Sequence, residues 1–345
     1  MSTPAIGSRT AVLVRKFSES TSFPFSEVLS EADIEAAVEA EKDGVAFRHR
    51  IFSPPVVVHS MLAQVLDPDP TCRKAVSRVS SLLVAAGKTP CAEDTSAYCK
   101  ARKRLSPGVL PRLTRLVAAR EEARVGKEHL WQGRRVRVVD GSSVSMPDTL
   151  ASQQAYPQPK AQAPGCGFPV ARIVAIFAWA SGVVLDAAID SLHVHELPLF
   201  RRIWDRLASG DVVLADRGFC NYGDIVQLKA RGVDTVFRMH QRKLHDFRKG
   251  VRLGPDDHLV TWQKGARPRG MSPEAFAALP EEITLRELRF RVDTPGFRTA
   301  EIVVVTTLLD PLAYPKEAIA ALYRDRWRCE LNLRHLKITL QMDVL

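Results

Sequence analysis

The sequence predicts an α/β protein in which a mixed β-sheet, interrupted by a β-rich insertion, follows a mainly helical N-terminal domain. The first 125 residues are mostly helical in pattern, and β-branched runs begin at Arg134. From there strands alternate with helices, and a segment rich in strands and turns occupies about residues 240–305. Because 345 residues exceed what one hydrophobic core usually holds, we expect at least two domains, residues 1–125 and 126–345.

The composition favours a polyanionic partner and a cytoplasmic location. The chain has 49 Lys and Arg against 39 Asp and Glu, a net charge of +10. Its six cysteines form no CxxC pair and no signal peptide precedes them, which is typical of reduced thiols. The longest apolar run, Val170 to Ile189, is interrupted by charged residues and by Ser181-Gly182, so it predicts two strands and a turn, not a membrane span.

Residues typical of helix starts and stops predict two helices in the N-terminal domain. Ser30 is a typical N-cap and acidic residues follow it, while Pro54-Pro55 begins a second helix that Asp67-Pro68-Asp69-Pro70 closes after Leu66. Basic residues then cluster: Arg73, Lys74 and Arg78, next Lys100, Arg102, Lys103 and Arg104, and finally Arg112, Arg115 and Arg120. Such helices either contact DNA phosphates or present a solvated charged surface, and we assign residues 1–125 as a DNA-binding domain.

The first strand of the second domain runs from Arg134 and is expected to end at Asp140, where Gly141 allows a turn. An Asp-Gly pair after a strand is by itself more often a turn than a metal ligand. The next strands, Val170 to Trp179 and Val183 to Asp190, are expected to pair as a hairpin. A helix over Glu196 to Leu207 should then lead to a buried strand that ends in Asp216.

A helix over Tyr222 to Ala230 and a strand over Val233 to Phe237 complete this order of elements, which is that of a ribonuclease-H-like fold. In that fold the first and fourth strands lie side by side. Asp140 and Asp216 are therefore expected to meet at one edge of the sheet.

The insertion is expected to contain three strands, His258 to Trp262, Thr284 to Val292 and Arg298 to Thr307. Its basic beginning, Arg238 to Lys249, is a candidate for contact with phosphates. Trp262 has two interpretations, stacking on a base or packing at a strand end, and the pattern favours packing.

A polar stripe is predicted on a helix near the end of the sequence. At about 100° per residue, Tyr323, Arg326, Glu330 and Lys337 fall within an arc of about 60°. A carboxylate beside an arginine, a lysine and a tyrosine can hold a divalent cation and also bind the phosphate that the cation activates. The alternative is the solvated edge of an ordinary amphipathic helix.

These motifs resemble the signature of DDE transposases of the insertion-sequence-4 family. The signature places Tyr, Arg, Glu and Lys at the intervals found in the polar stripe, and the resemblance extends over about residues 45–345. Asp140-Gly-Ser-Ser and Asp216-Arg-Gly-Phe also resemble its aspartate motifs.

The resemblance implies a catalytic site in which Asp140, Asp216 and Glu330 hold two Mg²⁺ ions, with Mn²⁺ as a substitute. Tyr323, Arg326 and Lys337 would contact DNA phosphates, and Trp327 would hold a flipped base or else pack in the core. The implied function is cut-and-paste DNA transposition, with hydrolysis and strand transfer at transposon ends. The implied partners are double-stranded terminal inverted repeats and target DNA, and the enzyme would be a bacterial-type, nucleoid-associated homodimer that binds no membrane.

Relatives are expected to continue beyond the position of Leu345 with a further helix and a dimerisation region, so a C-terminally truncated copy is expected. Two alternatives to an active transposase therefore stay open: a catalytically inactive DNA-binding remnant, and a ribonuclease-H-like nuclease without strand transfer. His193-Val-His195-Glu196 suggests a metal site only superficially, and a loop before a helix is favoured.

Overall fold

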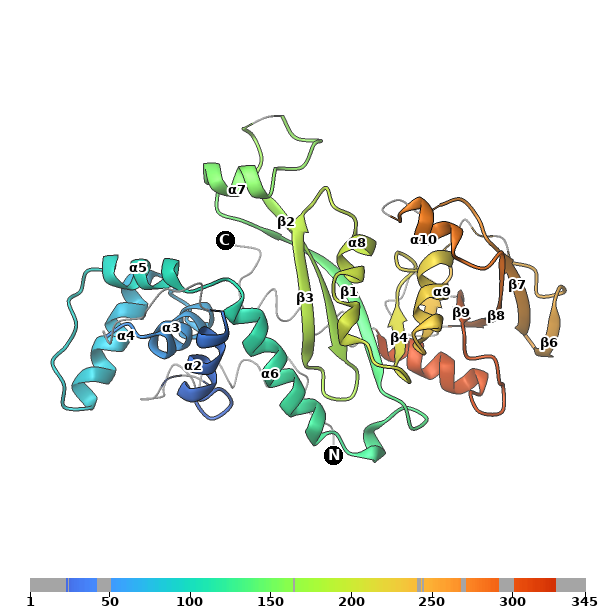
Figure 1. Ribbon diagram of the computed structural model, residues 1–345, viewed down its shortest axis with the longest axis horizontal. Coiled ribbons are helices and arrows are strands. Elements are labelled where there is room, and N and C mark those ends of the chain that lie inside the picture. The colour runs from blue at the N-terminus through green and yellow to red at the C-terminus, as the bar shows by residue number, and fades with distance from the viewer. Residues whose placement is uncertain are drawn as a thin grey trace. The chain divides into compact units, whose positions relative to one another are not determined.

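The computed structural model describes residues 23, 25–41, 51–163, 165–240, 243, 245–267, 271–291 and 301–326. The chain divides into two compact units, and in its N-terminal part the boundary falls between Arg120 and Glu121. The first unit contains the N-terminal helices and the second contains the sheet (Figure 1). Of the helices that the structure describes, none combines the length and apolar character needed to cross a bilayer.

The described part of the first unit is helical, as the sequence predicts. Its helices are α2 (Glu31–Ala40), α3 (Pro54–Leu66), α4 (Cys72–Ala85), α5 (Ser96–Arg104) and the first part of α6 (Val109–Arg124). The Ser30 side chain accepts a hydrogen bond from the backbone N–H of Asp33, and the Asp33 carboxylate accepts one from the backbone of Ser30. This reciprocal capping box fixes the start of α2. Ile34, Val58 and Leu113 belong to the core that these helices share.

One nine-stranded sheet organises the second unit, in the order β3-β2-β1-β4-β5-β9-β8-β7-β6. Its strands are β1 (Val136–Ser145), β2 (Val170–Ala178), β3 (Val184–Ser191), β4 (Val212–Ala215), β5 (Asp234–Arg238), β6 (Val251–Gly254), β7 (Asp257–Gln263), β8 (Glu282–Arg291) and β9 (Glu301–Thr306). β1, β4 and β5 are parallel neighbours, whereas β2 runs antiparallel to β1 and β3. The expected ribonuclease-H-like mixed sheet is confirmed.

β1 corrects one expectation from the sequence. The strand does not end at Asp140 but continues to Ser145, and Asp140 pairs with Ala175 of β2. The reason is that β2 is long enough to pair with β1 over its whole second half. Pairing with β4 stops earlier, at Val139 opposite Ala215. The side of β1 that faces β4 is therefore open from Asp140 onward, although the strand itself goes on.

Helices accompany the sheet at its connections. They are α7 (Leu150–Ala155), α8 (Glu196–Arg201), α9 (Tyr222–Ala230), α10 (Pro273–Ala277) and a helical segment over residues 316–326, with short 3₁₀ turns η1 (Lys127–His129) and η2 (Trp204–Arg206). α8 packs on β2 and β3, and α9 packs on β5. The helix expected over Glu196 to Leu207 is thus wrong in length, because the chain changes to a 3₁₀ turn after Arg201.

The β-rich insertion extends the same sheet. β9 pairs with β5, and β8, β7 and β6 follow outward (Figure 1). The short strand β6 and the helix α10 were not predicted. Trp262 is buried, and its indole N–H donates to Glu287 Oε1 at 2.8 Å, so the packing interpretation is confirmed. The five cysteines within the described ranges are free thiols.

Candidate active site

Asp140 and Asp216 lie at neighbouring positions of two parallel strands. Val139 of β1 is in register with Ala215 of β4, and each aspartate is the next residue of its own chain segment. All four residues of β4 are buried, whereas both aspartates are half-buried. The hydrophobic sheet therefore presents two adjacent carboxylates at the point where the pairing of β1 with β4 ends, as the sequence predicts.

A tight turn fixes Asp216. Its Oδ1 accepts a hydrogen bond of 2.7 Å from the backbone N–H of Gly218, a side-chain turn that aspartate favours. The next residue, Phe219, is buried, and its ring meets the ring of Phe200 edge to face at 5.6 Å between centroids. The packing of Phe219 against α8 therefore anchors the turn that carries the carboxylate.

Tyr323 and Arg326 lie on the helical segment 316–326 of the same unit. Both side chains are buried, and the Arg326 guanidinium carbon is 5.5 Å from the Tyr323 ring centroid. Burial raises the pKa of Tyr323 to about 12, the charges of Arg326 and Arg238 lower it, and that of Asp216 raises it. Tyr323 of the predicted polar stripe is thus within electrostatic range of Asp216, one of the predicted aspartates, as well as of Arg326. Arg238, at the end of β5, joins them.

The remaining residues of the stripe, Glu330 and Lys337, lie outside the described residues, and so does Trp327. Their predicted roles stay predictions.

Glu196 is a carboxylate at this site that the sequence analysis did not assign. A Cβ atom built on Gly141 would lie 2.4 Å from Glu196 Oε1, and one built on Gly218 would lie 3.5 Å from Glu196 Oε2. These glycines follow Asp140 and lie in the turn after Asp216. Burial raises the pKa of Glu196, the charge of Arg172 lowers it, and the charge of Asp216 raises it.

The order of strands contains the signal that could have located Glu196. β2 is antiparallel to both β1 and β3, so β3 runs in the same direction as β1. The C-terminal ends of β3 and β1 therefore lie at the same end of the sheet. The segment that follows β3 therefore begins at the same end of the sheet as the C-terminal ends of β1 and β4. Glu196 is the first residue of α8 in that segment.

An open pocket of about 660 Å³ lies beside this carboxylate, and its lining includes Arg172, His195, Glu196 and Gly218. His193 and His195 have exposed side chains. Among the residues that the structure describes, no group of three or more His, Cys, Asp and Glu side chains could hold a metal ion. His193 and His195 lie in the turn that precedes α8, which begins at Glu196, so the loop interpretation describes this segment.

Asp140 and Asp216 nevertheless fit a divalent cation such as Mg²⁺ as part of a ligand set. They supply carboxylate oxygens, which are the donors that Mg²⁺ prefers. Mg²⁺ is commonly bound through one or two carboxylates, with water and substrate phosphate completing its coordination. The pair therefore agrees in donor chemistry with two of the three predicted ligands.

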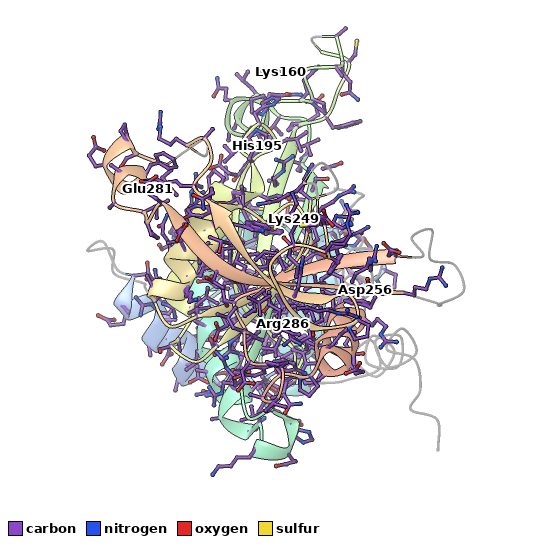
Figure 2. All side chains as sticks on the ribbon, turned by 90° about the vertical axis from the view of Figure 1, so that its right-hand side faces the viewer. Lys160, His195, Lys249, Asp256, Glu281 and Arg286 are labelled. Carbon is purple, nitrogen blue, oxygen red and sulfur yellow. The ribbon has the colours of Figure 1, made fainter. Side chains whose placement is uncertain are left out.

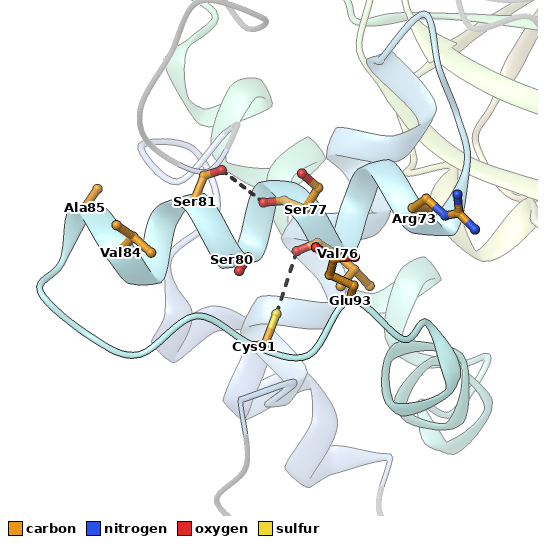
Figure 3. Close-up of a pocket in the computed structure, with 9 residues that line it drawn as sticks. All are labelled: Arg73, Val76, Ser77, Ser80, Ser81, Val84, Ala85, Cys91 and Glu93. Atoms are coloured by element: carbon orange, nitrogen blue, oxygen red, sulfur yellow. Dashed lines mark hydrogen bonds between the residues drawn. The ribbon is translucent and has the colours of Figure 1, made fainter.

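The N-terminal unit has a different surface character. Lys100, Lys103 and Arg104 of α5 have exposed side chains, whereas Arg112 donates to Glu41 and Arg120 to Asp33. A hollow of about 630 Å³ also runs along α4 (Figure 3). Serines and apolar side chains line most of it, and the hydroxyl of one of them, Ser81, donates to the backbone of α4 itself. The exposed basic residues, not this hollow, are the surface suited to a polyanion.

Comparison with known proteins decides the family. Residues 131–344 match the family described as "Transposase DDE domain". The chain belongs to the DDE-domain transposases. It is also 24% identical over 306 residues to the transposase InsG for insertion sequence element IS4 of Escherichia coli strain K12, which covers 89% of this chain. The predicted resemblance to insertion-sequence-4 transposases is confirmed, and the chain spans 66% of the length of that relative.

Proposed function

We propose that this DDE transposase carries out cut-and-paste DNA transposition, in which metal-dependent hydrolysis at the transposon ends is followed by strand transfer. The observation that carries the proposal is the placement of Asp140 and Asp216 at adjacent positions of the parallel strands β1 and β4. The Tyr323 phenol is within electrostatic range of Asp216 and of the guanidinium groups of Arg326 and Arg238. Carboxylates beside cationic side chains suit a reaction at a phosphodiester.

Each site residue has a proposed role. Asp140, Asp216 and Glu330 hold Mg²⁺, and two bound ions would activate the attacking hydroxyl and stabilise the leaving oxygen. Arg326 and Lys337, with the Tyr323 hydroxyl, bind the phosphates beside the scissile bond, so the DNA strand is oriented for in-line attack. Trp327 holds a base that leaves the stack.

The proposed partners follow from the same chemistry. Double-stranded terminal inverted repeats bind first and target DNA second, with the exposed basic residues of the N-terminal unit contacting phosphates. A homodimer would hold the two transposon ends together. The proposed location is the cytoplasm, in association with the nucleoid.

The deciding experiment incubates the full chain with DNA that carries the flanking inverted repeats, a target plasmid and Mg²⁺. Cleaved ends that become joined to the plasmid support transposition. Cleavage without joining would favour a nuclease, and end binding without cleavage would favour an inactive remnant.

DNA binding by the N-terminal unit can be tested through salt dependence. Changing Lys100, Lys103 and Arg104 together to alanine is expected to reduce the slope of log K against log salt concentration by up to about three, because each lost phosphate contact removes about one unit. Arg112→Ala is the matched control, since the Arg112 guanidinium is held by Glu41 at 2.8 Å. Electrophoretic mobility shifts with end DNA at several salt concentrations measure the slope. An unchanged slope in the triple variant would place the phosphate contacts elsewhere.

A further inference from the structure

Glu196 is an acidic residue beside the candidate site that the signature of three acidic residues does not include. Its side chain is half-buried at the start of α8, beside Gly141, which follows Asp140 in β1, and beside the turn that follows Asp216. This inference rests on the proposed function, because it assigns a role to Glu196 at the same cation site.

Gly141 leaves space that the Glu196 carboxylate occupies, and Gly218 lies beside the carboxylates of both Asp216 and Glu196. Glu196 Oε1 lies only 2.4 Å from where a Cβ of residue 141 would be, a separation that real Cβ atoms do not show. At Gly218, the Cβ position is 3.0 Å from Asp216 Oδ1 and 3.5 Å from Glu196 Oε2. The carboxylates of Asp216 and Glu196 therefore face one small space, which a side chain at residue 218 would fill.

The fold holds Glu196 in this position from two directions. α8 packs on β2 and β3, and its Leu199 and Phe200 are fully buried. On the other side, Arg172 of β2 donates a hydrogen bond of 2.8 Å to the backbone carbonyl of Val194, in the segment that leads to Glu196. Burial raises the pKa of Glu196, and the positive charge of Arg172 acts in the opposite direction and favours its ionised form. The carboxylate is thus presented at the site by rigid elements, not by a free loop.

A hydrated cation needs hydrogen-bond acceptors around it, and the Glu196 carboxylate can be one of them. Mg²⁺ gives up its water reluctantly and usually keeps several water ligands, whose hydrogens need acceptors. Outer acceptors of this kind orient the ligands of a metal and tune its affinity. Glu196, held beside Asp216 by α8, suits the role of such an outer acceptor.

We propose that Glu196 is a positioning residue that accepts hydrogen bonds from water molecules on the divalent cation beside Asp216. The site then has one more negative charge than the signature of three acidic residues provides. The cation would be held more tightly before DNA arrives.

The test measures cation binding directly with the full 345-residue chain in the absence of DNA. Mn²⁺ is titrated, and its free concentration is followed by electron paramagnetic resonance. Glu196→Gln keeps the shape of the side chain and removes the charge, and it is expected to weaken Mn²⁺ binding by about 10- to 100-fold. Glu281→Gln is the control, because it removes the same charge from a side chain that is 83% exposed. Glu281 and His195, the neighbour of Glu196, lie at separate places in Figure 2.

Two further measurements separate the possible failures. Wild-type Mn²⁺ affinity in Glu196→Gln, whether or not its thermal midpoint falls, would show that Glu196 is at most structural and would overturn the inference. Asp216→Asn tests the underlying site in the same titration. If Asp216→Asn loses binding and Glu196→Gln does not, only the role of Glu196 is wrong. If Asp216→Asn binds Mn²⁺ like the wild type, or the wild type binds none, the proposed cation site is wrong as well.

Discussion

Asp216→Asn is expected to lower the rate of Mg²⁺-dependent cleavage of end DNA by about a thousandfold or more. A catalytic cation contributes several kcal/mol to the transition state, and each 1.36 kcal/mol changes the rate about tenfold. The amide removes a charged oxygen ligand while it keeps an oxygen that can accept the hydrogen bond from Gly218, so the turn itself should survive. Asp140→Asn and Glu330→Gln are expected to act alike. Cleavage is measured with labelled end DNA under single-turnover conditions.

Binding and a matched aspartate provide the controls for this prediction. End-DNA affinity should change little in Asp216→Asn, because the residue is proposed to act on the cation. Asp205→Asn removes an aspartate charge at the η2 turn, where the side chain is 54% exposed, and should retain wild-type cleavage. Cleavage near the wild-type rate in Asp216→Asn would remove this residue from the catalytic site.

Arg286→Leu is expected to destabilise the sheet unit by about 3–5 kcal/mol, because it leaves a buried carboxylate without its partner. Arg286 is fully buried in β8, and its guanidinium donates to Asp257 at 2.7 Å and to the backbone carbonyl of Tyr314 at 2.7 Å. Asp257 is itself buried. The free energy of unfolding is measured by urea denaturation followed by circular dichroism.

The double variant Arg286→Leu/Asp257→Leu distinguishes the loss of a pair from the loss of packing. With both charges removed, much of the stability should return, since apolar replacements of buried ion pairs are often neutral. Arg248→Leu is the exposed counterpart, because Arg248 pairs with Asp246 but its side chain is 90% exposed, and its unfolding midpoint should hardly change. If Arg286→Leu and Arg248→Leu lowered the free energy of unfolding equally, burial of the ion pair would not be the cause of the effect.

The sequence allowed the central strand pairing to be predicted, because the alternation of strands and helices limits the possible topologies. It predicted that Asp140 and Asp216 are neighbours but placed Asp140 at a strand end. The Asp-Gly pair is typical of a turn, yet pairing with β2 overrides that local preference and continues β1 to Ser145. Tertiary pairing of this kind leaves no local trace in the sequence.

Glu196 shows a second limit. Its position at the site depends on where β3 ends relative to β1, and that position becomes visible only when the hairpin is folded onto the sheet. In the sequence, the two histidines of His193-Val-His195-Glu196 suggest metal ligands. In the structure their side chains are exposed, and it is Glu196 that lies close to the residues beside Asp140 and Asp216. Residues gathered from separate strands are therefore harder to predict than residues that share one helix.

The pairing of β9 with β5 also has a consequence for solubility. Without the insertion, β5 would be an edge strand whose free backbone groups could pair with another molecule. The four added strands move that edge outward to β6, which has only four residues, carries the exposed Arg252 and contains a register shift between Arg252 and Gly254. Short length, charge and irregular pairing all discourage intermolecular strand addition. The insertion thus replaces a regular edge beside the catalytic strands with one that protects the sheet from aggregation.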